Sequence, residues 1–438
     1  MTRVALLVGL ATLAATAWFV ARFASPIPFA DDLGMAPAMA PDFRVSLEWL
    51  WSQHNEHRIP LPRAVYLGLF RLLRDVRAAM FLEVAILGAA SFALVRAARF
   101  VRGRGALADA FFPLLLLHWG NAENLLMGFQ IAVTIPVAAV CAFLALVAAS
   151  PRLPAPRAAA GIGACLVVLP LCGGSGLTQA PPLLLWAALL GLRNRVARDA
   201  STRRSARILL AGAALSASIG ALYLVGFERP PGAALATSPV RVATAALQFL
   251  SLSIGPVAED LWPFSAVILV LPVLAAAAAL VRALRGGTRD GSRAAGILAC
   301  MASVALMALA VALGRAGMTE APLFATRFVM LPAPILAAAF LGMLACAPPR
   351  IARIGTGGLC AVMLLLLPLN ARTGVRYGRT REHDHHLVAV DVARGMAPLE
   401  LAERHHARLL ADEVRCAWML LILQRHGLPP FGERRGAR

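Results

Sequence analysis

Two neighbouring carboxylates, Asp31 and Asp32, stand in the segment PFADDLG near the N-terminus. A carboxylate can act as a general base that takes the proton of an attacking hydroxyl group, and two carboxylates together can hold a divalent cation. The same residues also suit a turn or a helix cap, because aspartate side chains accept hydrogen bonds from nearby backbone N–H groups. We take both as candidate catalytic residues, with capping as the structural alternative.

The densest polar cluster follows in the segment WLWSQHNEHRIPLPR. His54, Glu56 and His57 are candidate substrate ligands, and the spacing of the histidines supplies too few ligands for a zinc site. Arg58 and Arg63 flank a stiff Ile-Pro-Leu-Pro stretch and are candidates for phosphate binding, since the planar guanidinium can bind two oxygens at once. The alternative is ordinary pairing with Glu56 or with lipid head groups.

Three later segments add polar groups. HWGNAENLLMGFQ carries Glu123, a further candidate substrate ligand. GRAGMTEAPLFATRF carries Arg315 and Arg327, which directly adjoin apolar stretches. A cation kept there is a candidate anion ligand, although a long side chain that reaches toward the membrane surface is the simpler explanation for either arginine singly. The glycines of GGSGLTQAP allow close approach of a ligand or of a neighbouring helix.

The composition shows which elements must position these groups. The 438 residues are 59% hydrophobic and only 15% charged, whereas a soluble domain carries roughly 25% charged residues. This excludes a cytosolic enzyme, a secreted domain and a disordered regulator. The net charge is +19, and all 42 basic residues are arginine because the sequence has no lysine. Compositional bias therefore explains much of the positive charge, and no nucleic-acid partner is predicted.

Apolar windows predict the spans. A membrane-crossing helix needs about 20 mostly apolar residues, and about eleven windows qualify. They are Val4–Ala24, Ala78–Val95, Leu107–Trp119, Ile131–Ala149, Ala158–Leu171, Ala180–Leu192, Ile208–Phe227, Trp262–Val281, Ala295–Leu313, Phe328–Cys346 and Ile354–Leu369. A further stretch, Val242–Gly255, is shorter and contains Gln248.

Arginine placement predicts the orientation, because short cytoplasmic loops collect arginine. With the N-terminus in the cytoplasm, the arginine-rich gaps, such as 193–207 and 282–293, fall inside. This requires Val242–Gly255 to stay on the outer surface and puts the C-terminus outside. We therefore expect an all-α polytopic membrane protein with a membrane domain over residues 1–370, a structured first outer loop at 25–77 and a small helical outer tail at 371–438.

The motifs FADD, WLWSQHNEHRIPLPR, ENLLMGFQ, GGSGL, ATRF and LQRHGLPPF, together with the multi-span pattern, resemble bacterial proteins similar to the type C glycosyltransferases, the GT-C superfamily. That resemblance implies a polyprenyl-phosphate-linked sugar as donor and a bacterial inner-membrane location with a periplasmic C-terminus. It also implies that Asp31 or Asp32 is the catalytic base or a metal contact.

Two features depart from the superfamily pattern. The carboxylates are adjacent rather than spaced as D-x-D, and the tail is too small for the large soluble domain of some oligosaccharyltransferases. We therefore predict a glycan or lipid acceptor in the cell envelope, assign no metal ligands, and leave open a divalent cation. The main alternative function is a multi-span transporter or a flippase for lipid or polysaccharide, and a third hypothesis is a scaffold without catalysis.

Overall fold

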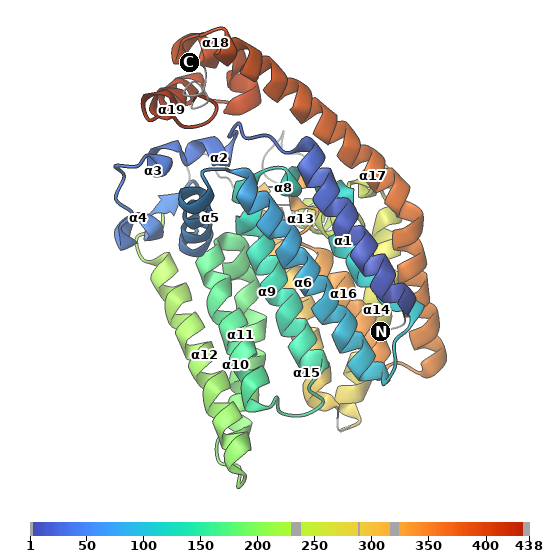
Figure 1. Cartoon of the computed structure of the whole chain (residues 1–438). Helices are drawn as coiled ribbons and strands as arrows, with labels where there is room; N and C mark the ends of the chain where they lie inside the picture. Colours follow the sequence, from blue (N-terminus) through green and yellow to red (C-terminus); the bar gives the residue numbers. More distant parts are fainter. Residues whose placement is uncertain (1–2, 229–237, 288–289, 316–323, 432–438) are drawn as a thin grey trace.

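The computed structural model of the chain describes residues 3–228, 238–287, 290–315 and 324–431, which fold almost entirely into helices (Figure 1). Within these ranges nine helices are long and apolar enough to cross a membrane, which confirms the predicted class of all-α polytopic membrane protein. They are α1 (Arg3–Phe23), α6 (Arg77–Arg102), α9 (Ile131–Ala148) with the turn before it, α11 (Gly174–Asn194), α12 (Ala200–Leu224), α14 (Phe264–Arg285), α15 (Gly291–Arg315), α16 (Ala333–Cys346) with the segment before it, and α17 (Pro349–Ala393).

The burial of each helix follows from its apolar pattern. Residues Ala333 to Met343 of α16 are all buried, because this helix is apolar on every side and lies inside the bundle. By contrast, α14 exposes Phe264, Val267 and Leu271, as expected of a helix that faces lipid. Helices suit this setting because they satisfy their backbone hydrogen bonds internally, where lipid offers none.

The predicted span Leu107–Trp119 is not one continuous helix. It is broken into η1 (Leu107–Ala110), α7 (Phe111–Leu116) and η2 (Trp119–Asn121). At its start, Arg102 at the end of α6 pairs with Asp109 at 2.7 Å, whereas the later Gly128 lies against Val76, just before α6 begins. The broken segment and the turns after it therefore run from one end of α6 to the other.

Two further apolar segments are shorter than a standard span. The predicted span Ala158–Leu171 corresponds to α10 (Pro156–Val168) and the turn η4 (Leu169–Cys172), which pack against α9 and α12. The stretch Val242–Gly255 corresponds to α13 (Pro239–Ser251) and the turn η5 (Leu252–Ile254), and its Val242 packs against Ala312 of α15.

The first loop has its own structure. It contains α2 (Asp31–Gly34), α3 (Ala36–Met39), α4 (Leu47–Trp51), the two-residue strands β1 (Gln53–His54) and β2 (His57–Arg58), and the amphipathic α5 (Pro60–Leu73). The strands pair antiparallel, with His54 opposite His57. Tyr66 and Phe70 on the inner face of α5 are buried, so this helix anchors the loop on the bundle.

The tail folds back over that loop. Helix α17 continues without a break through the expected boundary at residues 370 and 371 and extends beyond the bundle (Figure 1). Helices α18 (Pro398–Leu409) and α19 (Glu413–Arg425) then return over the first loop, where Leu401 and Met419 share a core with Leu33 and Met39. We call the end of the bundle that carries the first loop, α18 and α19 the capped end. The arginine-rich connections, including those after α6 and α11, lie at the opposite end (Figure 1).

Candidate functional site

Asp31 is the candidate base that a substrate can reach. It begins α2, its side chain is 45% exposed, and its Oδ1 lies 3.5 Å from Nε2 of His54. The His54 ring packs on Phe129, with 5.3 Å between ring centroids, which fixes its position. Burial alone would raise the pKa of Asp31, but His54, Arg327 and Arg415 together hold it below its ordinary value. Asp31 is therefore ionised at neutral pH.

Asp32 has a different environment although it is the next residue. Its side chain is completely buried and accepts hydrogen bonds from the backbone N–H groups of Gly128 at 3.1 Å and Phe129 at 2.7 Å. Burial raises the pKa of Asp32 to about 7, and the Asp31 charge adds to this, while Tyr66 and the two N–H groups oppose it. Asp32 therefore joins the first loop to the turn before α9 and has no room for an acceptor hydroxyl.

A backbone reversal at Ala30 sets the two carboxylates in place. Ala30 has φ of 48°, a left-handed conformation that disfavours residues with a Cβ atom. Its N–H group donates to the carbonyl of Leu409 in the tail at 2.5 Å. The tail therefore holds the turn from which Asp31 projects.

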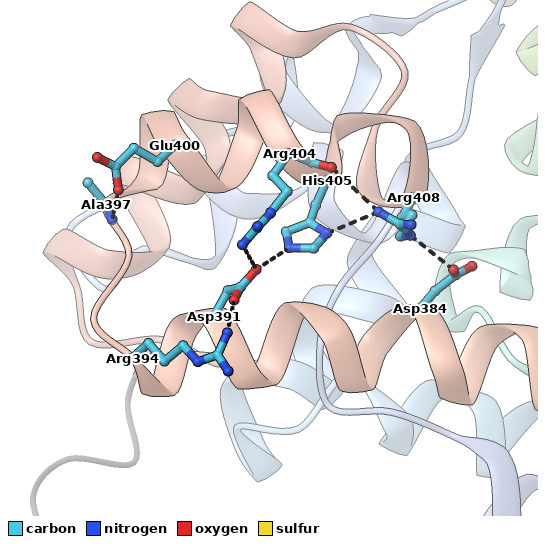
Figure 2. A network of polar contacts seen from close by, with 8 residues as sticks. All are labelled: Asp384, Asp391, Arg394, Ala397, Glu400, Arg404, His405 and Arg408. Carbon is cyan, nitrogen blue, oxygen red and sulfur yellow. Dashed lines mark hydrogen bonds and ion pairs between the residues drawn. The ribbon is translucent and has the colours of Figure 1, made fainter.

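A polar network fixes the tail itself (Figure 2). The buried Asp391 of α17 accepts from Arg404 at 2.9 Å and lies 2.9 Å from Nε2 of the buried His405 on α18. Arg408, also on α18, bonds to Asp384 at 3.1 Å. Since these contacts tie α18 to α17, they stabilise the helix end whose Leu409 carbonyl binds Ala30.

The β1–β2 hairpin places His57 against the glycine-rich segment marked in the sequence. A Cβ atom at Gly174 would lie 3.0 Å from His57 Nδ1, and one at Gly173, where φ is +93°, would lie 2.9 Å from Ile59. Burial lowers the pKa of His57, although Glu56, whose Oε1 lies 3.8 Å away, opposes this. These glycines therefore let the hairpin sit directly on the first turn of α11.

Arg58 is a structural cation rather than an open anion ligand. Its buried guanidinium donates to four backbone carbonyls at 2.9–3.1 Å. Those acceptors belong to Trp51, Tyr223, Val225 and Gly226. Arg58 therefore fastens the hairpin to the end of α12, and four of its five guanidinium N–H groups are used within the protein.

Arg63 has a similar role within the first loop. Its Nη1 donates to the carbonyls of Trp49 and Ser52 at 2.7 and 2.8 Å, and its guanidinium lies 4.8 Å from the Trp49 ring centroid. Burial lowers the pKa of Arg63 to about 10, so it stays charged at neutral pH. Both arginines proposed from the sequence as phosphate ligands thus organise the loop backbone.

We expect the change Arg58→Met to destabilise the capped end by about 2–3 kcal/mol, because it leaves the buried carbonyl of Tyr223 and three part-buried carbonyls without their donor. Thermal unfolding and limited proteolysis of residues 25–77 in purified protein measure this effect. Arg71→Met is the matched control, since Arg71 is exposed and, within the part of the chain that the structure describes, its side chain makes one hydrogen bond, to the Phe43 carbonyl at 2.8 Å. Equal loss in both variants would contradict the assigned role of Arg58.

Arg315 and Arg327 are two cations of the site whose side chains form no ion pair with the described residues, and we call them the open arginines. Arg315 ends α15 and Arg327 lies in η7 (Thr326–Phe328), and their guanidinium carbons lie 4.6 and 5.4 Å from the centroid of the Phe328 ring. Among the described residues, neither forms an ion pair within 4 Å, although Arg327 is close enough to act on Asp31 and Arg315 on Glu56. Residues 316–323 between them lie outside the described ranges.

Glu123 lies at the same end of the bundle. It belongs to α8 (Ala122–Leu125) and accepts a hydrogen bond from the hydroxyl of Thr326, the residue before Arg327. This contact brings the ENLLMGFQ and ATRF segments together. Glu123 therefore positions η7 and stands next to one of the two open arginines.

The structure thus separates the sequence candidates into two groups. At the capped end it places Asp31, His54, Glu56, His57, Glu123, Arg315 and Arg327. It buries Asp32, Arg58 and Arg63 as supports. Arg415 of the tail also acts on Asp31, and its spacing in the sequence does not indicate this, because the packing of α19 on α2 is a long-range contact.

A metal site is not evident in the described ranges, where no group of three or more His, Cys, Asp or Glu side chains is arranged to hold an ion. The seven cysteines are all free.

Comparison with known proteins finds no match to any family model, to any curated protein or to any solved structure.

Proposed function

We propose that this protein is an integral membrane glycosyltransferase of the GT-C type, which moves a sugar from a polyprenyl-phosphate donor to an envelope glycan or lipid. One observation carries the proposal: the half-exposed Asp31, paired with His54 and acted on by Arg327, stands at one end of an otherwise apolar bundle. A carboxylate base beside unpaired cations at a membrane surface suits attack by a hydroxyl group and departure of a lipid phosphate.

In the proposed reaction the acceptor oxygen bonds to the anomeric carbon of the sugar while the bond from that carbon to the phosphate oxygen breaks. Asp31 takes the proton of the acceptor hydroxyl. The electron pair of the broken bond stays on the phosphate, which leaves as polyprenyl phosphate. A single base is enough for such an inverting transfer.

Arg327 and Arg315 are the proposed counter-charges for the phosphate, because neither is neutralised by a carboxylate within the described residues. His57 adds a hydrogen-bonding group beside the N-terminus of α11, whose first-turn N–H groups carry partial positive charge. Asp32, Arg58 and Arg63 are positioning residues in this scheme. The amphipathic α5 would lie at the interface beside the polyprenyl chain.

The proposal includes eleven membrane crossings in the bacterial inner membrane, with a cytoplasmic N-terminus and a periplasmic capped end. The nine long helices supply nine of them, and α10 and the broken segment from Leu107 supply two. Support comes from the arginine-rich connections, which gather at the end opposite the cap, as cytoplasmic loops do.

A transporter or flippase is the second candidate function, and one residue favours it. Glu83 of α6 is a fully buried carboxylate, and among the described residues no group meets hydrogen-bond geometry with either of its oxygens. Ionisable groups inside spans commonly mark substrate or proton pathways. The site at the capped end supports transfer more strongly, because several open polar groups converge there around Asp31.

The proposed function predicts that a strain lacking the gene accumulates one polyprenyl-phosphate-linked sugar. Mass spectrometry of lipid extracts from the wild type, the deletion strain and the complemented strain measures this directly. Return to the wild-type profile on complementation would identify the donor. Identical lipids in all three strains would contradict transfer and direct attention to transport assays with Glu83→Gln.

A further inference from the structure

A cleft of about 750 Å³ lies at the capped end, apart from the groups assigned to transfer. This size falls within the range of about 300–1,000 Å³ that is typical of small-molecule sites. One wall is a single face of α17, formed by residues spaced three, four and seven apart: Glu382, His385, His386, Ala389 and Val392. The other walls are the end of α1 with the segment after it, residues 22–27, and residues 429–431, which follow α19.

His385 is the unusual group in this cleft. It is only 6% exposed, and neither of its buried ring nitrogens has a hydrogen-bond partner among the described residues. Its ring packs on Phe29, with 5.2 Å between centroids, so packing holds it in the wall. Buried polar atoms are nearly always paired in folded proteins, so two unpaired nitrogens beside a cleft point to a ligand that pairs with them.

The charges that line the cleft indicate what kind of ligand fits. Arg22 and Glu382 pair with each other at 2.6 Å and so cancel at the rim. Neutral imidazole offers one donor and one acceptor, which matches the donor and acceptor of a hydroxyl group. The side-chain amide of Gln424 also carries both functions.

The apolar walls complete the match. Phe23, Ile27 and Phe431 line the cleft together with Pro429 and Pro430. Such surfaces pack against the C–H faces of a sugar ring, while the few polar groups orient its hydroxyls. We propose that this cleft binds an uncharged saccharide through His385. The assignment is independent of the transfer reaction, because it involves none of the residues given a role in it.

Saturation-transfer NMR on the full-length protein in lipid nanodiscs tests the proposal. The probes are free glucose, galactose, N-acetylglucosamine and maltose, with glucuronic acid and glucosamine as charged counterparts. We expect signals from at least one uncharged sugar and weaker signals from the charged ones. Absence of transfer to every uncharged sugar, or stronger transfer to a charged one, would overturn the proposal.

Matched variants locate the binding. His385→Leu should weaken the signal about fivefold through loss of a hydrogen bond, and Val392→Trp should abolish it by filling the cleft. His383→Leu is the control, since His383 lies on α17 but is exposed and outside the cleft. Wild-type signals in Val392→Trp, which keeps His385, would show that the sugar binds elsewhere and refute the assignment.

Discussion

Replacing Asp31 with asparagine is expected to lower the rate of sugar transfer by about 10³-fold, within the range that a positioned general base contributes. The amide has about the same size as the carboxylate, but it cannot take the proton from the hydroxyl group of the acceptor substrate. Transfer measured in membranes, with the donor that accumulates in the deletion strain, reports the loss. Because the Asp31 side chain is 45% exposed and its support comes from charged side chains rather than from backbone donors of the described residues, we expect the variant to fold normally.

Asp42→Asn is the matched control for this change. Asp42 is in the same loop, its side chain is 77% exposed, and its Oδ1 lies 3.7 Å from Nε2 of His426. Transfer in this variant should equal that of the wild type. Near-normal transfer in Asp31→Asn would remove Asp31 from the mechanism, whereas equal loss in both variants would indicate a general effect on the loop.

The pH profile distinguishes a base from a residue that only supports the fold. Since His54 and the nearby arginines hold the pKa of Asp31 below its ordinary value, transfer should persist under acidic conditions until Asp31 is protonated. His54→Gln removes one of these stabilising contacts, so it should move the acidic limb of the profile to higher pH. An unchanged limb would mean that His54 does not act on the base.

The sequence predicted the helical membrane class because that class depends on local composition. Runs of about 20 apolar residues suffice to mark helices such as α6 and α15. Breaks within a run are harder to foresee, as in the segment from Leu107, where neighbouring helices supply the hydrogen bonds that an interrupted helix leaves open. Thr16 of α1, for example, donates to the Leu117 carbonyl just after α7.

The candidate site could be predicted only as a set of residue types. Asp31 and Asp32 are equivalent in the sequence, and they differ in the fold because Phe129, 97 residues later, donates to Asp32. Arg58 likewise resembles an anion ligand until the carbonyl of Tyr223, 165 residues away, fills one of its donor positions. Such distinctions depend on long-range packing, which the spacing of residues does not encode.

Asp32 should make the stability of the capped end depend on pH. Its pKa is about 7 in the folded protein, above the ordinary value near 4 that applies to the unfolded chain. The folded state therefore binds this proton more tightly, so its contribution to stability is complete below about pH 4 and is lost as the pH rises through 7. The expected loss is on the order of 4 kcal/mol, since at pH 8 the fold must keep a buried carboxylate charged.

Thermal unfolding of the purified protein between pH 5 and pH 8 measures this dependence, and Asp32→Asn isolates it. The histidines also titrate in this range, so the slope of the variant must be subtracted from that of the wild type. Asparagine keeps one acceptor oxygen for Phe129 or Gly128 and carries no charge, so the variant should lose less stability than the wild type as the pH rises. Equal slopes would mean that the two N–H groups hold Asp32 ionised throughout, in which case its role is a permanent anionic clamp. The adjacent carboxylates would then differ only in access to substrate, and Asp31 would still be the one that can take a proton from an acceptor.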